Sequence, residues 1–406
     1  MAKNQYDLKD FSGSKEENLV RSVFKNIISD SGFLLPAFLN IVIQRSNAID
    51  GKSFSDASVY LRLNYEHAEA YAKNYIEGYP ECRGVYLKDI LALNIFKEFL
   101  TDGVDAIRKH STACRQSFLA LFEFLRERTT HEEAIWKLAK GTSLSGIKET
   151  QIMVGLAHHL FSQLVPGKKY EVDEYAKQLP KECCCGCNAT VYGGNTSVGS
   201  TRTWHGRVDI MLNHTIAVTL GNEETESTEE DDADAEPASK QRKLETDGNS
   251  DICAEVKANK KYDNIFESRL LEQILAEAIT NGFAQLNRSR STLLHFLIPT
   301  IGVTSDHVSV CLYDPEYDCL LLSSKRLRLW IPEKKILNNE IIVVIWLFLN
   351  FTVFTEQKVA TKYDLDKSGL HAELKNHLQH YRKVETKESV ISTSVPVKYS
   401  FCPKSK

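Results

Sequence analysis

The chain has 406 residues, of which 42% are hydrophobic and 26% charged, a composition that excludes collagen-like and largely disordered proteins. The formal net charge is -4, but much of the negative charge lies in one segment, so the average does not exclude an anionic partner such as nucleic acid. This length predicts two or three domains of roughly 100 to 200 residues each.

The N-terminus lacks the basic and then apolar run of a secretory signal, which predicts a soluble intracellular protein. The ten cysteines are then expected to be mostly reduced thiols. The most apolar stretch, Ile341 to Phe354, is shorter than the roughly 20 residues that cross a bilayer, so we expect a buried core element and no membrane partner. The basic residues Lys240, Arg242 and Lys243 favour the nucleus over the cytoplasm.

Apolar residues recur at helical spacing from Glu16 to about Lys140, which predicts an N-terminal helical domain over residues 1–145. A further helix is expected from about Ile147 to Val165, with the domain boundary just before it. The second predicted domain covers residues 146–325. A helical extension over 326–385 and a flexible tail over 386–406 complete the predicted layout.

The pattern changes to that of β-strands at Arg207–Leu212. The residues expected on one face of this strand are Val208, Ile210 and Leu212. A second short strand, Thr215–Leu220, follows the tight turn that Asn213 and His214 favour.

The next segment, residues 222–250, is of low complexity. Nine of the sixteen residues from Gly221 to Glu236 are acidic. Charge blocks of this kind stay solvated, so we expect a disordered acidic insertion. A spacer is the favoured role, and a surface for basic protein partners is the alternative.

A third strand is predicted over Asp251–Ala258, and a strong helix over residues 264–287. Further strands are expected at Leu293–Val303, His307–Tyr313 and Cys319–Ser323. The predicted fold class is therefore α+β or α/β, with a helical domain followed by a central mixed sheet flanked by helices.

Two acidic residues on predicted strands, Asp209 and Glu255, have the chemistry of ligands for a divalent metal ion. Lys257 lies two residues after Glu255 on the same face, roughly 6.5 to 7 Å along the strand, where its ammonium group can reach a phosphate or an attacking water. The backbone carbonyl of Val256 can add a further oxygen ligand. This set fits metal-assisted hydrolysis of a phosphodiester bond.

Asp209 in Arg207-Val208-Asp209-Ile210, together with Glu255-Val256-Lys257, resembles the PD-(D/E)XK or restriction-endonuclease-like nucleases. The resemblance implies that Asp209 and Glu255 bind Mg²⁺ or Mn²⁺, and that Lys257 activates water or contacts phosphate. It also implies a contribution from Gln273 on the following helix and a weaker one from Glu149. The expected activity is an endonuclease or exonuclease acting on nucleic acid, with DNA as the expected substrate.

The sequence departs from the family pattern in two ways. Val208 stands where the family often has proline, and 45 residues separate Asp209 from Glu255, largely because of the acidic insertion. The alternative hypothesis is a non-catalytic scaffold with a nuclease-like fold, in which the helical domain and the acidic loop bind protein partners. In that case Glu255 and Lys257 are a solvent-facing charge pair.

A cysteine-rich loop contains one C-x-x-C pair, Cys184 and Cys187. We expect a reduced, partly exposed loop, with zinc bound by this pair and His205 as the alternative. His158 and His159 are expected to be a surface or half-buried pair, because neighbours on a helix point about 100° apart and rarely act together.

Overall fold

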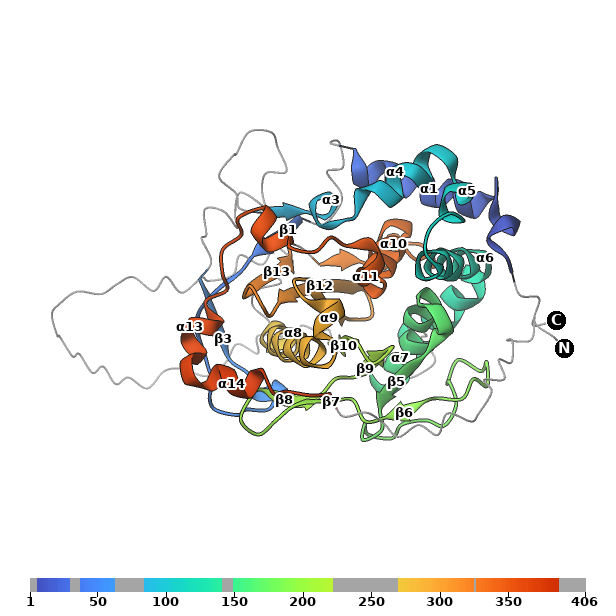
Figure 1. Ribbon diagram of the computed structural model, residues 1–406. Helices are drawn as coiled ribbons and strands as arrows, with labels where there is room; N and C mark the ends of the chain where they lie inside the picture. Colours follow the sequence, from blue (N-terminus) through green and yellow to red (C-terminus); the bar gives the residue numbers. More distant parts are fainter. Residues whose placement is uncertain are drawn as a thin grey trace, which may run out of the picture.

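The computed structural model describes residues 6–29, 37–62, 84–140, 149–221, 269–324 and 326–386. Within these ranges, ten strands form one mixed central sheet (Figure 1). In sheet order the strands are β4 (Gly84–Tyr86), β1 (Ala37–Asn40), β13 (Cys319–Ser323), β12 (His307–Asp314), β11 (Ile298–Val303), β10 (Ile216–Leu220), β9 (Ile210–Leu212), β5 (Tyr170–Asp173) and β6 (Gly193–Gly194), with β14 (Leu327–Arg328) paired to β12.

Most neighbouring strands are antiparallel, but β10 pairs with β11 in parallel, as β5 does with β6. The parallel pair requires a crossover between its strands. The described part of that crossover is the long helix α8 (Arg269–Arg288). Two small antiparallel sheets lie outside the central one, formed by β2 (Val42–Ser46) with β3 (Val59–Arg62) and by β7 (Ser197–Gly199) with β8 (His205–Arg207).

Helices cover the sheet on both faces (Figure 1). The helices of the larger hydrophobic core are α1 (Lys15–Ile28), α4 (Leu93–Asp102), α6 (Thr112–Lys140), α7 (Glu149–Leu156) and α10 (Asn339–Leu349). The second core contains α8, α13 (Leu370–Leu374) and α14 (Leu378–Tyr381). Shorter helices are α3 (Leu87–Ile90), α5 (Val104–Ile107), α9 (Arg290–Leu293), α11 (Phe351–Phe354) and α12 (Val359–Lys362). The prediction of a central mixed sheet flanked by helices is confirmed.

The apolar stretch near the C-terminus forms α10 and α11. Every side chain from Ile341 to Leu349 is buried, and burying one large apolar side chain contributes about 1.5 to 3 kcal/mol. Trp346 packs on Phe354 with ring centroids 4.3 Å apart, so the two helices belong to one core. The expected buried core element is confirmed, and no helix in the described ranges is long and apolar enough to cross a membrane.

The N-terminal part differs from its prediction as a purely helical domain, because it contains strands β1 to β4 as well as helices. β1 pairs with β13, almost 300 positions later in the chain, and β4 extends the same sheet. Phe38 of β1 also packs on Phe348 of α10, with centroids 5.6 Å apart. Residues from both sides of the predicted boundary at 146 thus share one sheet and one core.

The β9–β10 hairpin forms where the sequence predicts it. Asn213 and His214 at the turn have φ values of 49° and 56°, the left-handed conformation that a two-residue hairpin turn requires. The Thr215 N–H donates to the Leu212 carbonyl at 2.9 Å and closes the turn. Asparagine adopts this conformation more readily than most residues, which explains why the local sequence was informative.

The predicted strand Arg207–Leu212 is wrong in one respect, because the chain bends at Val208 and Asp209. β8 ends at Arg207 and pairs with β7, whereas β9 begins at Ile210 and pairs with β10. Val208 therefore packs in the second core, while Ile210 belongs to the larger one. The bend leaves Asp209 at the start of β9, outside the regular ladder.

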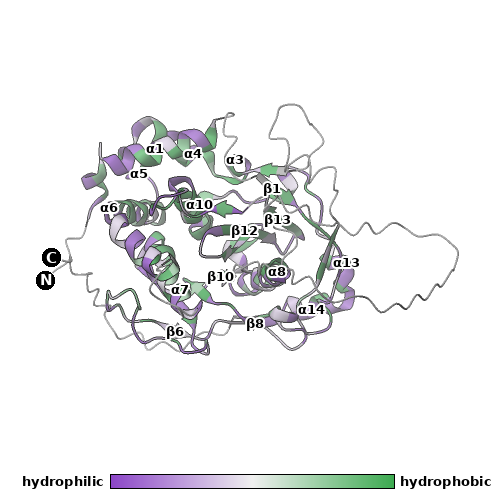
Figure 2. Ribbon diagram, turned by 180° about the vertical axis from the view of Figure 1, so that it is seen from behind, coloured by the Kyte–Doolittle hydropathy of each residue, from purple (hydrophilic) through white to green (hydrophobic). Residues whose placement is uncertain are grey.

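Helix α8 and strands β12 and β13 confirm their predictions, but the start of the predicted helix at 264 lies outside the described residues. The strand predicted from Leu293 begins only at Ile298, because α9 occupies the first positions. The apolar face of α8 packs on the sheet, whereas α1 and α4 pack on the helical layer that contains α6 and α10. Figure 2 shows hydrophobic and hydrophilic residues mixed along each of these helices.

Candidate functional site

Asp209 lies where three strands meet. Its Oδ2 accepts a hydrogen bond from the Leu220 N–H of β10 at 2.6 Å, and its carbonyl accepts one from the Asp173 N–H of β5 at 3.1 Å. The side chain is only half-buried. The carboxylate is thus fixed by the backbone while one side of it remains accessible.

A second acidic residue, Glu277, lies on the face of α8 that contacts β10, and its side chain is completely buried. Its Oε2 accepts a hydrogen bond from the Thr219 hydroxyl, and its Oε1 accepts one from the Gln273 amide at 2.9 Å. In the β9–β10 ladder Val218 stands opposite Ile210, so the next step of the register places Thr219 beside Asp209. We refer to Asp209, Glu277, Thr219 and Gln273 as the carboxylate site.

Both acids of the carboxylate site hold protons unusually tightly. Burial raises the pKa of Asp209 to about 7, and the negative charges of Glu149 and Asp173 add to the rise against the hydrogen bond from Leu220. Burial also raises the pKa of Glu277 to about 8, with a contribution from the charge of Asp209. Both carboxyl groups therefore titrate near neutral pH, and a cation at the site would stabilise the ionised forms that burial disfavours.

A cationic side chain lies at the edge of the carboxylate site. The Arg207 Nε is 3.6 Å from the Asp173 Oδ1, and its guanidinium lies over the Tyr175 ring at 4.0 Å from the centroid. Arg207 is exposed, so its charge can also meet an anionic ligand from solvent.

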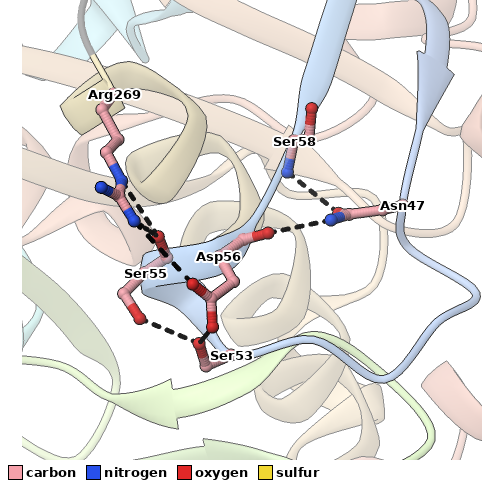
Figure 3. Close-up of polar contacts among 6 residues, drawn as sticks. All are labelled: Asn47, Ser53, Ser55, Asp56, Ser58 and Arg269. Carbon is pink, nitrogen blue, oxygen red and sulfur yellow. Dashed lines mark hydrogen bonds and ion pairs between the residues drawn. The ribbon is translucent and has the colours of Figure 1, made fainter.

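The first turn of α8 is fixed by the loop that precedes β3 (Figure 3). The Arg269 Nη2 donates to the Ser55 carbonyl at 3.0 Å and is 3.8 Å from the Asp56 carboxylate. Asn47 in turn donates to the Asp56 carbonyl at 2.9 Å. These contacts set the position of the helix that carries Gln273 and Glu277.

The chain enters and leaves residues 222–268 at the same place. The Gly221 N–H donates to the Val303 carbonyl at 2.8 Å, and a Cβ on Gly221 would lie 2.1 Å from a side-chain carbon of Leu270. A side chain at position 221 would therefore require Leu270 to move. The segment that contains Glu255 and Lys257 therefore begins beside Leu220, whose N–H binds Asp209, and ends at the first turn of α8.

The predicted site residues fall into two groups. Asp209 and Gln273 belong to the same cluster, joined through Glu277, whereas Glu255, Val256 and Lys257 lie outside the described residues. In the sheet, β10 pairs with β11 in parallel. Sequence analysis missed Glu277, although an acidic residue four positions after Gln273, within an apolar stripe, was a signal that could have found it.

A second cluster lies in the larger core. The side chains of His159, Cys183, Cys185 and Cys187 place one ligand atom each within 4.8 Å of one another, and all four are buried. We refer to them as the cysteine cluster. Its residue types and spacing could hold a metal ion.

The cysteine cluster corrects two predictions. Cys184 is exposed and its thiol donates to the Glu182 carbonyl, so the pair Cys184 and Cys187 does not point to a common site. His205 is not in the cluster either. The histidine pair was expected to be at the surface or half-buried. His158 is half-buried as expected, but His159 is buried, within a π-turn at Ala157–Phe161.

His131 on α6 completes the surroundings of the cysteine cluster. Its Nδ1 lies 3.1 Å from the Nδ1 of His159, and burial lowers the pKa of His131 well below its usual value. The Lys137 ammonium donates to the Cys185 carbonyl at 2.7 Å. The cluster therefore joins the helical layer to the loop between β5 and β6.

No known protein family, curated protein or solved structure matches this chain. The chemistry of the carboxylate site and of the cysteine cluster is therefore the ground for assigning a function.

Proposed function

We propose that the chain is a metal-dependent nuclease, with Asp209 as a ligand of a divalent cation. The observation that carries this proposal is the half-buried Asp209 carboxylate, which is fixed between β5 and β10 and has its pKa raised to about 7. A carboxyl group held in this way exchanges its proton for a metal ion at neutral pH.

The order of the elements supports the proposal. A helix, α7, is followed by the antiparallel strands β5, β9 and β10, then by α8 and by β11 parallel to β10. The resemblance implies a core of helix, three-strand meander, helix and strand, with the meander matched to residues 202–220 and 251–258. The described elements are compatible with this order, and the last meander strand lies outside the described residues. Asp209 directly precedes β9, within the range that the resemblance matches to the start of the meander.

The residues of the site fit a hard divalent cation such as Mg²⁺ or Mn²⁺. Such an ion neutralises charge on the phosphate and lowers the pKa of bound water. Asp209 supplies a carboxylate, and Glu255 and the Val256 carbonyl supply the further oxygen ligands that the sequence predicts. Lys257 is then the group that holds the phosphate or orients the attacking water.

Gln273 and Glu277 act as positioning residues in this proposal. Glu277 is fully buried and engaged by both Gln273 and Thr219, so it orients the strand that faces Asp209 and does not reach substrate. Its raised pKa leaves it mostly protonated at pH 7, which keeps a second negative charge away from Asp209.

The test is cleavage of plasmid and single-stranded DNA by the full chain with Mg²⁺ or Mn²⁺, alongside calorimetric titration with Mn²⁺. Asp209→Asn should abolish metal-dependent cleavage and weaken Mn²⁺ binding. The matched control is Asp105→Asn, because Asp105 is an exposed aspartate in α5, outside the carboxylate site. Equal cleavage by the wild type and Asp209→Asn would refute the proposal.

A second candidate function is a scaffold without catalytic activity. It is favoured by the hydrogen bond from Leu220, which gives Asp209 a structural role at the end of β10 even without a metal. This hypothesis predicts that Asp209→Asn destabilises the fold while Mn²⁺ has no effect on the melting temperature of the wild type. A rise in melting temperature with Mn²⁺ that Asp209→Asn abolishes would exclude it.

A further inference from the structure

We propose that His159, Cys183, Cys185 and Cys187 form a structural zinc site, independent of the nuclease proposal. Three soft thiolates and one imidazole form the ligand set that zinc takes in closed structural sites. The side chains of the four residues are 3%, 4%, 7% and 4% exposed, so the site is shielded from water.

The distances among the ligand atoms match those around a single tetrahedral ion. With Zn–S bonds of about 2.3 Å and Zn–N bonds of about 2.0 to 2.1 Å, tetrahedral geometry separates two sulfurs by about 3.8 Å and a nitrogen from a sulfur by about 3.5 Å. The His159 Nε2 is 3.2 Å from the Cys185 sulfur and 3.5 Å from those of Cys183 and Cys187. The sulfurs of Cys183 and Cys185 are 3.5 Å apart.

The orientation of His159 is set from its far side. The Nε2 faces the sulfurs, and the Nδ1 is 3.1 Å from the Nδ1 of His131. With Nε2 as the ligand, the Nδ1 of His159 carries the proton, and this N–H donates a hydrogen bond to the Nδ1 of His131. A metal-binding histidine usually donates its second N–H to such a partner, which fixes the tautomer and the ring.

Backbone hydrogen bonds within the loop hold the three cysteines in place. The Cys183 N–H donates to the Ala189 carbonyl at 2.8 Å, and Glu182 and Thr190 form an isolated antiparallel bridge. Gly186 turns the chain with a φ of 94°, a conformation that favours glycine. The turn brings alternate cysteines to one side and leaves Cys184 on the other.

A positive charge lies beside this loop. Three thiolates outweigh a doubly charged zinc ion by one negative charge, and Lys137 places its ammonium at the Cys185 carbonyl. An all-protein shell of four ligands leaves no open position for substrate, which makes the site structural rather than catalytic. The ion would tie the loop between β5 and β6 to α6 and the π-turn, beside the strand that ends at Asp173.

Metal analysis of the full chain, purified without a polyhistidine tag and dialysed against a weak chelator, tests this proposal. We expect about one zinc per chain in the wild type. Cys187→Ser should lose nearly all of it. Cys184→Ser is the matched control, since it removes an exposed thiol from the same loop, and it should keep the zinc of the wild type.

Three outcomes of the metal analysis would overturn the zinc site: a wild type without zinc, iron in its place, or equal zinc in Cys187→Ser and the wild type. If Cys187→Ser does not fold, Co²⁺ substitution of the wild type and of Cys184→Ser decides the question. Both should show thiolate-to-cobalt charge-transfer absorption, and its absence would also overturn the site. These measurements need neither DNA nor Mg²⁺, so they stand or fall separately from the nuclease proposal.

Discussion

The carboxylate site and the cysteine cluster are both buried groups of ionisable side chains, yet they differ in every property that selects a metal. The first has oxygen ligands, remains half-open at Asp209 and binds protons near neutral pH. The second has sulfur and nitrogen ligands and is closed on all sides. Oxygen groups favour hard cations such as Mg²⁺, and thiolates with imidazole favour zinc, so we propose different ions for the two sites.

The largest effect on stability is expected when one ligand of the cysteine cluster is removed. Because a structural zinc ion contributes much of the folding free energy of its surroundings, Cys185→Ser should lower the free energy of unfolding by about 3 kcal/mol or more. Cys184→Ser should change it by less than about 0.5 kcal/mol. Urea unfolding in zinc-containing buffer measures both, and equal midpoints would contradict a structural ion.

The next largest effect concerns activity at the open site. Lys257→Ala should reduce the rate of metal-dependent DNA cleavage on the order of 100-fold or more, because it removes a charge aimed at the phosphate in the transition state. Lys260→Ala, a change of the same kind three residues later, should have at most a few-fold effect. Single-turnover cleavage rates separate the two, and similar losses would remove Lys257 from the proposed site.

The two sites should also differ in how pH acts on stability. The folded-state pKa values of Asp209 and Glu277, about 7 and about 8, are raised, so the folded chain holds these protons more tightly than the unfolded chain. Their contribution is complete below about pH 4 and is lost as pH rises toward 8. Without divalent metal, we expect the free energy of unfolding to fall by several kcal/mol, on the order of 6 kcal/mol for these pKa values, between pH 5 and pH 8.

Glu277→Gln tests how much Glu277 contributes to this pH dependence, because an amide keeps the shape of the side chain but does not titrate. Thermal unfolding between pH 5 and pH 8 should show a flatter profile for Glu277→Gln than for the wild type. The control Asp105→Asn should follow the wild type. If the stability of the wild type instead rises between pH 5 and pH 8, the pKa values of the two carboxyl groups are not raised in the folded state.

The smallest expected effect comes from the positioning residue of the open site. Gln273→Ala removes one hydrogen bond to the buried Glu277 carboxyl and should destabilise the fold by about 1 to 2 kcal/mol. Gln116→Ala replaces an exposed glutamine on α6 and should be nearly neutral. Chemical unfolding measures the stability of both variants. An unchanged stability for Gln273→Ala would mean that the hydrogen bond from Gln273 to Glu277 does not stabilise the fold.

Elements with local signals could be predicted from the amino-acid sequence. The turn at Asn213 and His214, the apolar stripe of α8 and the alternation in β12 depend on residues a few positions apart, and all formed as predicted. Asp209 was identified for the same reason, since it stands within a short strand pattern.

Contacts between residues far apart in the sequence could not be predicted, because they depend on how the elements pack in three dimensions. His159 reaches Cys183, 24 positions later, because a π-turn rotates it inward and the loop after β5 folds back. Glu277 is held on Thr219 of β10 by the packing of α8, close enough for the charge of Asp209 to raise its pKa. Periodicity reports which face of an element is apolar, but it carries no information on the long-range packing that places two faces in contact.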